Sequence, residues 1–112
     1  MNFTLALLLL INSERALPLE NSAVLNSLAQ TRAEYLCEHN QWSHDGWLDS
    51  FKDVKGSVYG ENLAKNFNSA KSAHKALMAS PTHKFNVMRS EYRYLGVGQS
   101  CGITVELFAD KL

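Results

Sequence analysis

The sequence predicts one α+β domain, and three observations lead to this fold class. The chain has 112 residues, near the commonest domain size, so we expect a single domain over residues 1–112. Its first third carries apolar residues at helical spacing, interrupted by Pro18. Its last fifth has two strand-like stretches on either side of a glycine-containing turn. A hydrophobic content of 46% with 20% charged residues is typical of a globular protein.

The first helix is expected over residues 3–16, capped by Asn2. The apolar run 3–11 also has the length of a signal-peptide core, but no Lys or Arg precedes it. Residues 13–16 are a poor cleavage site as well, because Glu14 occupies a position where a small residue is required. The sequence therefore favours a structural helix packed into the core, in which Leu9 is a candidate buried residue.

The remaining elements follow from periodicity and breakers. A second helix should begin near Asn21 or Ser22 and end near Glu38, because its apolar residues recur every three or four positions. Residues 39–57 are expected to form a long ordered loop anchored by aromatics. A third helix is predicted over 69–80, ended by Pro81. Strands are predicted over 58–63, 92–99 and 103–109, the last two joined by a tight hairpin at 100–102.

The two cysteines, Cys37 and Cys101, are too few for a disulfide framework. They could pair, because one ends a predicted helix and the other lies at the predicted hairpin. The favoured expectation is that both are buried free thiols, because an unpaired cysteine behaves as a small apolar residue and is commonly buried.

Charge argues against a nucleic-acid partner, and hydropathy argues against a transmembrane segment. Lys and Arg together equal Asp and Glu at eleven each, and there is no basic block, which predicts no nucleic-acid partner. No apolar run of 18 residues occurs, so we expect no transmembrane segment.

Three residues form the most chemically suggestive constellation in the chain. His44 lies in a turn-like stretch, Glu61 in the strand 58–63, and His83 in a turn after the third helix. Two imidazoles suit zinc or another divalent cation, and a carboxylate can complete or orient such a set, so the predicted metal ligands are His44, His83 and Glu61. The alternative is that the histidines hydrogen-bond to Glu61 and to backbone and hold a cleft in shape.

Other histidine arrangements carry less weight. Ser80 precedes His83 by three residues, but a serine at a helix end is usually a cap or solvated. His39 follows Cys37 by two residues, yet a Cys–His metal cluster there would need a further ligand such as Cys101. His74 is expected to be a solvated or partly buried helix residue.

The order of these motifs resembles the CAP superfamily (cysteine-rich secretory, antigen 5 and pathogenesis-related proteins, with an SCP-like domain), in particular its compact bacterial or phage branch. The resemblance covers nearly the whole chain. It is carried by Leu9–Ala16, residues 29–33, Ser43–Gly46, Tyr59–Ala64, Ser80–Asn86 and the closing strands.

The resemblance implies a three-layer α-β-α sandwich with a small antiparallel sheet and a surface cleft. In the wider family the cleft holds two histidines and two acidic residues. His44, Glu61 and His83 match three of these positions, whereas Ser80 stands where the second acid belongs. The predicted cleft residues are thus His44, Glu61, Ser80 and His83.

The function expected from the resemblance is a binding module whose His/Glu cleft holds a divalent metal or small ligand. Its partner would be a small ligand, a cell-wall component or a protein. One alternative is a metal- or His-dependent hydrolase of peptide or cell-wall material. Another is a structural or interaction protein with a decayed site. The family is usually exported, which suggests an extracellular or cell-surface location; without a convincing signal peptide, a virion or the cytoplasm is the alternative.

Overall fold

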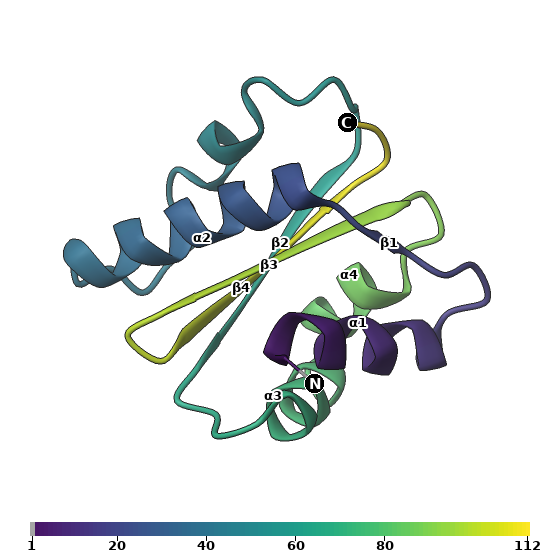
Figure 1. Ribbon diagram of the computed structural model, residues 1–112, viewed down its shortest axis with the longest axis horizontal. Helices are drawn as coiled ribbons and strands as arrows, with labels where there is room; N and C mark the ends of the chain where they lie inside the picture. The colour runs from purple at the N-terminus through teal and green to yellow at the C-terminus, as the bar shows by residue number, and fades with distance from the viewer. Residues whose placement is uncertain (1) are drawn as a thin grey trace.

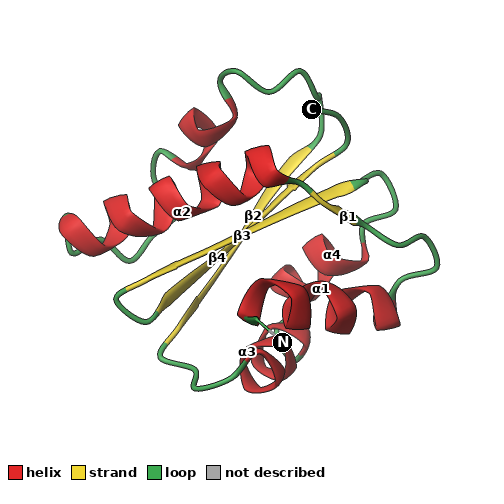
Figure 2. Cartoon of the chain, in the orientation of Figure 1, coloured by secondary structure: helices red, strands yellow, loops and turns green. Residues whose placement is uncertain are grey.

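The computed structural model describes residues 2–112 and has three layers (Figures 1 and 2). A sheet lies in the middle, with one long helix over one face and three shorter helices over the other. This arrangement confirms the predicted α+β sandwich. In chain order the elements are α1 (Phe3–Glu14), β1 (Glu20–Asn21), α2 (Ala23–Glu38), the 3₁₀ helix η1 (Trp47–Phe51), β2 (Tyr59–Lys65), α3 (Ala70–Met78), α4 (Pro81–Met88), β3 (Tyr94–Ser100) and β4 (Ile103–Ala109).

The sheet has the order β1-β3-β4-β2. The three long strands pair antiparallel, as expected, whereas the two-residue β1 adds a short parallel edge that the sequence did not predict. In the β2–β4 register, Glu61 lies opposite Leu107 and Asn62 lies opposite Glu106. Because neighbouring side chains of a strand point to opposite faces, Glu61 belongs to the α2 layer and Asn62 to the layer of α3 and α4.

The core consists of two apolar clusters, one on each face of the sheet. On the α2 side, the predicted face of β4, namely Ile103, Val105, Leu107 and Ala109, packs against Leu25, Ala29, Ala33 and Leu36. On the opposite side, Leu7 and Ile11 of α1 meet Val87, Tyr92, Leu95 and Phe108. Successive side chains of β4 point to opposite faces of the sheet, so the strand contributes to both clusters. This explains why all seven of its residues are buried.

Helix α1 confirms the predicted structural helix and corrects one residue in it. Asn2 accepts a hydrogen bond from the amide of Leu5, as a capping residue should. Leu7 and Ile11 are fully buried, but Leu9 is half exposed. The expectation that Leu9 is a core residue was wrong, because one face of the helix packs and Leu9 lies outside that stripe.

The prediction that His83 lies in a turn after Pro81 was also wrong. The third helix does stop before Pro81, but Pro81 is the first residue of α4, and His83 lies in that helix. Proline is favoured at this position because the first helical amides have no intrahelical partner and its fixed φ suits a helix. A helix breaker at the end of α3 is thus a helix starter for α4.

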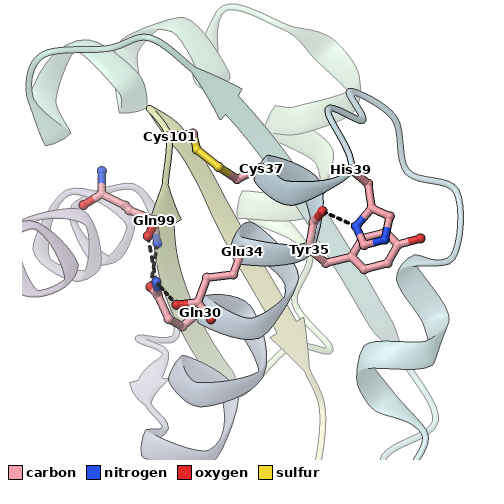
Figure 3. Close-up of a disulfide and its surroundings, with 7 residues drawn as sticks. All are labelled: Gln30, Glu34, Tyr35, Cys37, His39, Gln99 and Cys101. Carbon is pink, nitrogen blue, oxygen red and sulfur yellow. Dashed lines mark hydrogen bonds between the residues drawn. A yellow bond between two sulfur atoms is a disulfide. The ribbon is translucent and has the colours of Figure 1, made fainter.

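The two cysteines form a disulfide between the end of α2 and the β3–β4 hairpin (Figure 3). The favoured expectation of free buried thiols was therefore wrong. The Cα atoms lie 5.7 Å apart, within the range that a disulfide requires. Cys101 and Gly102 both have positive φ, which is the backbone of a two-residue hairpin turn and lies within the hairpin predicted at 100–102.

Side chains of α2 also protect the edge of β3 that β1 leaves uncovered. Gln30 accepts a hydrogen bond from the amide of Gln99 and donates one to its carbonyl, at 2.9 and 2.8 Å (Figure 3). Asn26 accepts from the amide of Val97 at 2.9 Å. These bonds satisfy strand groups that would otherwise be open to another chain. Among the described residues, none of the helices is long and apolar enough to cross a membrane.

Candidate functional site

Glu61 is the buried centre of the candidate site. It lies in β2 with a side chain that is 1% exposed, and it forms an ion pair with Arg32 of α2. The Arg32 Nε donates to Oε2 at 2.8 Å, and Nη2 donates to Oε1 at 3.4 Å. A buried carboxylate requires such a partner, because an isolated charge in the interior is strongly destabilising.

His44 approaches the same carboxylate from the loop after α2. Its Nδ1 lies 2.8 Å from Oε1 of Glu61, while about half of the imidazole is exposed. The loop is held in place because Nη2 of Arg32 also donates to the carbonyl of Ser43 at 3.3 Å. Arg32 thus fixes both the carboxylate and the loop that presents His44. Hydrogen bonding of the histidines to Glu61 was the alternative to a metal site, and for His44 such a contact is present.

His83 and Ser80 form a second pair at the start of α4. The Nδ1 of His83 lies 2.8 Å from Oγ of Ser80. This contact explains why Ser80 occupies the N-cap position without a capping hydrogen bond from its side chain. Burial lowers the pKa of His83, and the nearby charge of His44 lowers that pKa further. His83 is therefore neutral near pH 7, and the two histidines lie near enough to interact electrostatically.

Two asparagines connect the pairs. Asn86 donates to the backbone carbonyl of Glu61 at 3.2 Å and to the side-chain oxygen of Asn62 at 2.9 Å. Asn62 donates to the backbone carbonyl of His83 at 3.2 Å. Because the amides bridge β2 and α4, they hold the helix that carries His83 against the strand that carries Glu61.

A hollow of about 260 Å³ adjoins the second pair. Ser80 and His83 line it together with Lys65, Leu77 and the half-exposed side chains of Trp42 and Phe67. The ammonium of Lys65 lies 5.4 Å from the centre of the Trp42 ring, within the range of a cation–π contact. The cleft at His83 therefore offers an aromatic, partly apolar wall beside a neutral imidazole.

The contacts of Glu61 do not leave its carboxylate free to complete the predicted three-ligand set. Both oxygens of Glu61 accept hydrogen bonds, so this carboxylate orients His44. Within residues 2–112, no group of three or more His, Cys, Asp or Glu side chains is arranged to hold a metal ion. Each candidate histidine has an oxygen partner at Nδ1, and no described residue bonds to its Nε2.

The other histidines lie outside this arrangement. His39 stacks on Tyr35 and its Nδ1 contacts the carbonyl of that residue at 2.9 Å. Its neighbour Cys37 is in the disulfide, so the alternative Cys–His cluster is absent from the described chain. His74 is 6% exposed, with its Nε2 3.7 Å from a carboxylate oxygen of Glu14. It is a packed residue between α3 and α1, more buried than the sequence suggested.

Sequence reasoning missed three residues that organise the site, namely Arg32, Asn62 and Asn86. For Arg32 a signal was present, because it falls on the stripe of α2 that also carries Leu25, Ala29 and Leu36. A charged residue on a buried stripe implies a buried partner. The asparagines gave no comparable signal, since their role depends on the packing of α4 against β2.

Comparison with known proteins identifies the class to which this fold and cleft belong. The model of the CAP family, described as the cysteine-rich secretory protein family, matches residues 11–103. The chain therefore belongs to the CAP family. No curated protein sequence matches.

Solved structures share the fold over nearly the whole chain. An extracellular SCP-domain protein from Bacillus anthracis superimposes with a TM-score of 0.90 at 23% identity, over 96% of this chain and 40% of that one. A cysteine-rich secretory protein from Staphylococcus aureus gives 0.89 at 19% identity, over 98% and 38%. The chain thus spans about two fifths of these two proteins. An outer surface protein from Borrelia burgdorferi gives 0.82 at 19% identity, over 100% and 97%.

Proposed function

We propose that this chain is an extracellular binding module whose cleft takes a divalent metal, with zinc as the test ion, at the Nε2 atoms of His44 and His83. The observation that carries the proposal is the pairing of each Nδ1 with an oxygen, on Glu61 and Ser80 respectively. Such a partner fixes the ring orientation of a metal-binding histidine and leaves the other nitrogen free. The lowered pKa of His83 adds support, because only the neutral imidazole binds metal.

The residues define what each group would contribute. His44 and His83 would hold the ion, Glu61 would orient His44, and Ser80 would orient His83. A bound zinc ion would act as a Lewis acid or would anchor a ligand's oxygen. With two protein ligands, the site should be weaker than a closed four-ligand structural site.

Calorimetry with zinc chloride at pH 7.5 tests the proposal. We expect measurable binding by the native chain and its loss in His44→Ala and in His83→Ala. His39→Ala is the matched control and should bind as the native chain does, because the ring of His39 stacks on Tyr35 and its Nδ1 contacts the carbonyl of that residue. Ser80→Glu should tighten binding by placing a carboxylate beside His83.

Proton competition provides a second measurement. Zinc affinity should fall at low pH, because protonation removes the lone pair with which an imidazole binds the ion. For His83 this fall should come below the usual histidine range, because burial lowers its pKa. Zinc binding that survives both single histidine substitutions would contradict the proposed site. Absence of binding would instead favour the structural or interaction protein.

The extracellular location rests on the fold relatives, two of which are described as an extracellular protein and an outer surface protein. Fractionation of the source cells with an antibody to the chain tests it. Recovery outside the cell or on its surface is the expected result, and recovery only from the cytoplasm would contradict it.

A hydrolase is the second candidate, and the Ser80–His83 hydrogen bond is the observation that favours it. In such a reaction Oγ of Ser80 would attack a carbonyl carbon while His83 accepts its proton. However, no described residue bonds to Nε2 of His83, whereas a triad base is oriented by a third group at its second nitrogen. We therefore expect no labelling of Ser80 by a fluorophosphonate probe, with or without zinc. Labelling that disappears in Ser80→Ala would establish the hydrolase instead.

A further inference from the structure

A second hollow, of about 340 Å³, lies between α2 and the loop that carries η1. Its walls come from one face of α2 and from residues 45–53, and none of the four cleft residues lines it. Leu28 and Tyr35 supply apolar surface. The hollow is therefore distinct from the one at His83, although Arg32, which lines it, also holds Glu61.

Arg32 supplies one buried polar group to this hollow. The residue is 5% exposed, and its Nε and Nη2 are used by Glu61 and Ser43. Its Nη1 has no hydrogen-bond partner among residues 2–112 and lies beside Gly46, where an added Cβ would approach it to 4.0 Å. Arg32 and Gly46 both line the hollow. The side chain of Arg32 is thus held almost entirely inside the protein, while this nitrogen is open to the hollow. An acceptor oxygen of a ligand can bond to it there in place of water.

The rim of the hollow has the opposite charge. Three carboxylates, those of Asp45, Asp49 and Asp53, line it against the single ammonium of Lys52. None of these four side chains forms an ion pair with a described residue, whereas the charge of Arg32 is matched by Glu61. An excess of unpaired carboxylates favours a cation and disfavours an anionic ligand.

We propose that this hollow binds the basic side chain of a peptide partner, for which lysine is the test residue. The hollow offers an apolar surface, an N–H donor and an excess of carboxylates. A lysine residue within a peptide complements all three, with its methylene stem, its amide oxygen and its ammonium. Its methylene stem would cover Leu28 and Tyr35, its ammonium would face the carboxylates, and an amide carbonyl of the peptide would accept from Nη1 of Arg32.

The test is a titration of the ¹⁵N-labelled chain with N-acetyl-lysine N-methylamide, followed by amide chemical shifts. The matched probe is the norleucine analogue, which keeps the stem and both amides but lacks the ammonium. We expect saturable shifts at residues 28–35 and 45–53 with the lysine probe. Binding should weaken when the salt concentration rises from about 20 to about 300 mM, because exposed charges are screened.

Variants separate charge recognition from loss of folding. Asp49→Asn with Asp53→Asn removes two exposed carboxylates and should weaken binding about two- to twentyfold. Glu38→Gln, an equally exposed change on α2 away from the hollow, should leave it unchanged. Thr31→Trp should block the hollow while the thermal melt stays cooperative.

Four other outcomes of these experiments would overturn the proposal. Equal binding of the norleucine probe, no effect of salt, or shifts confined to residues outside the hollow would show that a basic side chain is not recognised there. No saturable shift up to the solubility limit of the lysine probe would show the same.

Discussion

At the scale of single residues, the most unusual group is Glu106 in the middle of β4. Its side chain is fully buried, Oε1 accepts from Asn62 at 3.2 Å, and Oε2 has no partner among the described residues. Burial raises the pKa of Glu106 from 4.5 to about 7, because the charged form is poorly solvated inside the protein. The carboxyl is therefore protonated in the folded chain under mildly acidic conditions.

This shift gives the stability of the chain a defined pH dependence. Between pH 4.5 and about 7 the folded state binds a proton at Glu106 that the unfolded state has released. The free energy of unfolding should therefore fall as the pH rises through this window, by about 2–3 kcal/mol between pH 5 and pH 8.

Glu106→Gln tests this prediction, because glutamine keeps the shape and does not titrate. Urea denaturation of both chains at several pH values should show that the difference in stability moves in favour of the variant as the pH rises. A difference that stays constant from pH 5 to pH 8 would mean that Glu106 has an ordinary pKa in the folded state.

At the scale of elements, α1 shows that an apolar sequence does not identify the buried residues of its own helix. Leucine occupies positions 7, 8, 9 and 10 in succession, so the sequence has little amphipathic pattern. Only contact with α3 and with the sheet distinguishes the fully buried Leu7 from the half-exposed Leu9.

Two substitutions in α1 should therefore differ in cost. Leu7→Ala should lower the free energy of unfolding by about 2–5 kcal/mol, because it leaves a cavity in the core. Leu9→Ala should lower it by less than about 1 kcal/mol. Chemical denaturation measures both values, and equal costs would contradict the packing of α1 seen here.

At the scale of the whole molecule, the disulfide joins parts of the chain that are 64 residues apart. It fixes the end of α2 to the β3–β4 hairpin and so connects the helical layer on one face to the sheet (Figure 3). A cross-link over so long a loop restricts the unfolded chain strongly.

Loss of the disulfide should cost about 4 kcal/mol by the loop-entropy relation. We expect the melting temperature to drop when the native chain is reduced, and the Cys37→Ala/Cys101→Ala variant to melt at a similarly lowered temperature. Reductant should not affect the variant, which controls for other effects of the reagent. A native chain whose melting temperature is the same before and after reduction would contradict a stabilising disulfide.

The sequence alone determined the elements whose patterns are local. Helix α2 and the β3–β4 hairpin follow from apolar periodicity and from turn residues. Local patterns suffice there because backbone hydrogen bonding and side-chain alternation depend on near neighbours in the chain.

Only the tertiary structure decided the remainder, because it depends on residues far apart in sequence. Packing of α4 on β2 brings Asn86 to Glu61, and Arg32 becomes an organiser of the site only when α2 covers the sheet. That close packing also needs Gly96 and Gly98, where a side chain would collide with the backbone of α2. The disulfide likewise depends on where α2 ends relative to the hairpin, which no spacing within either element specifies.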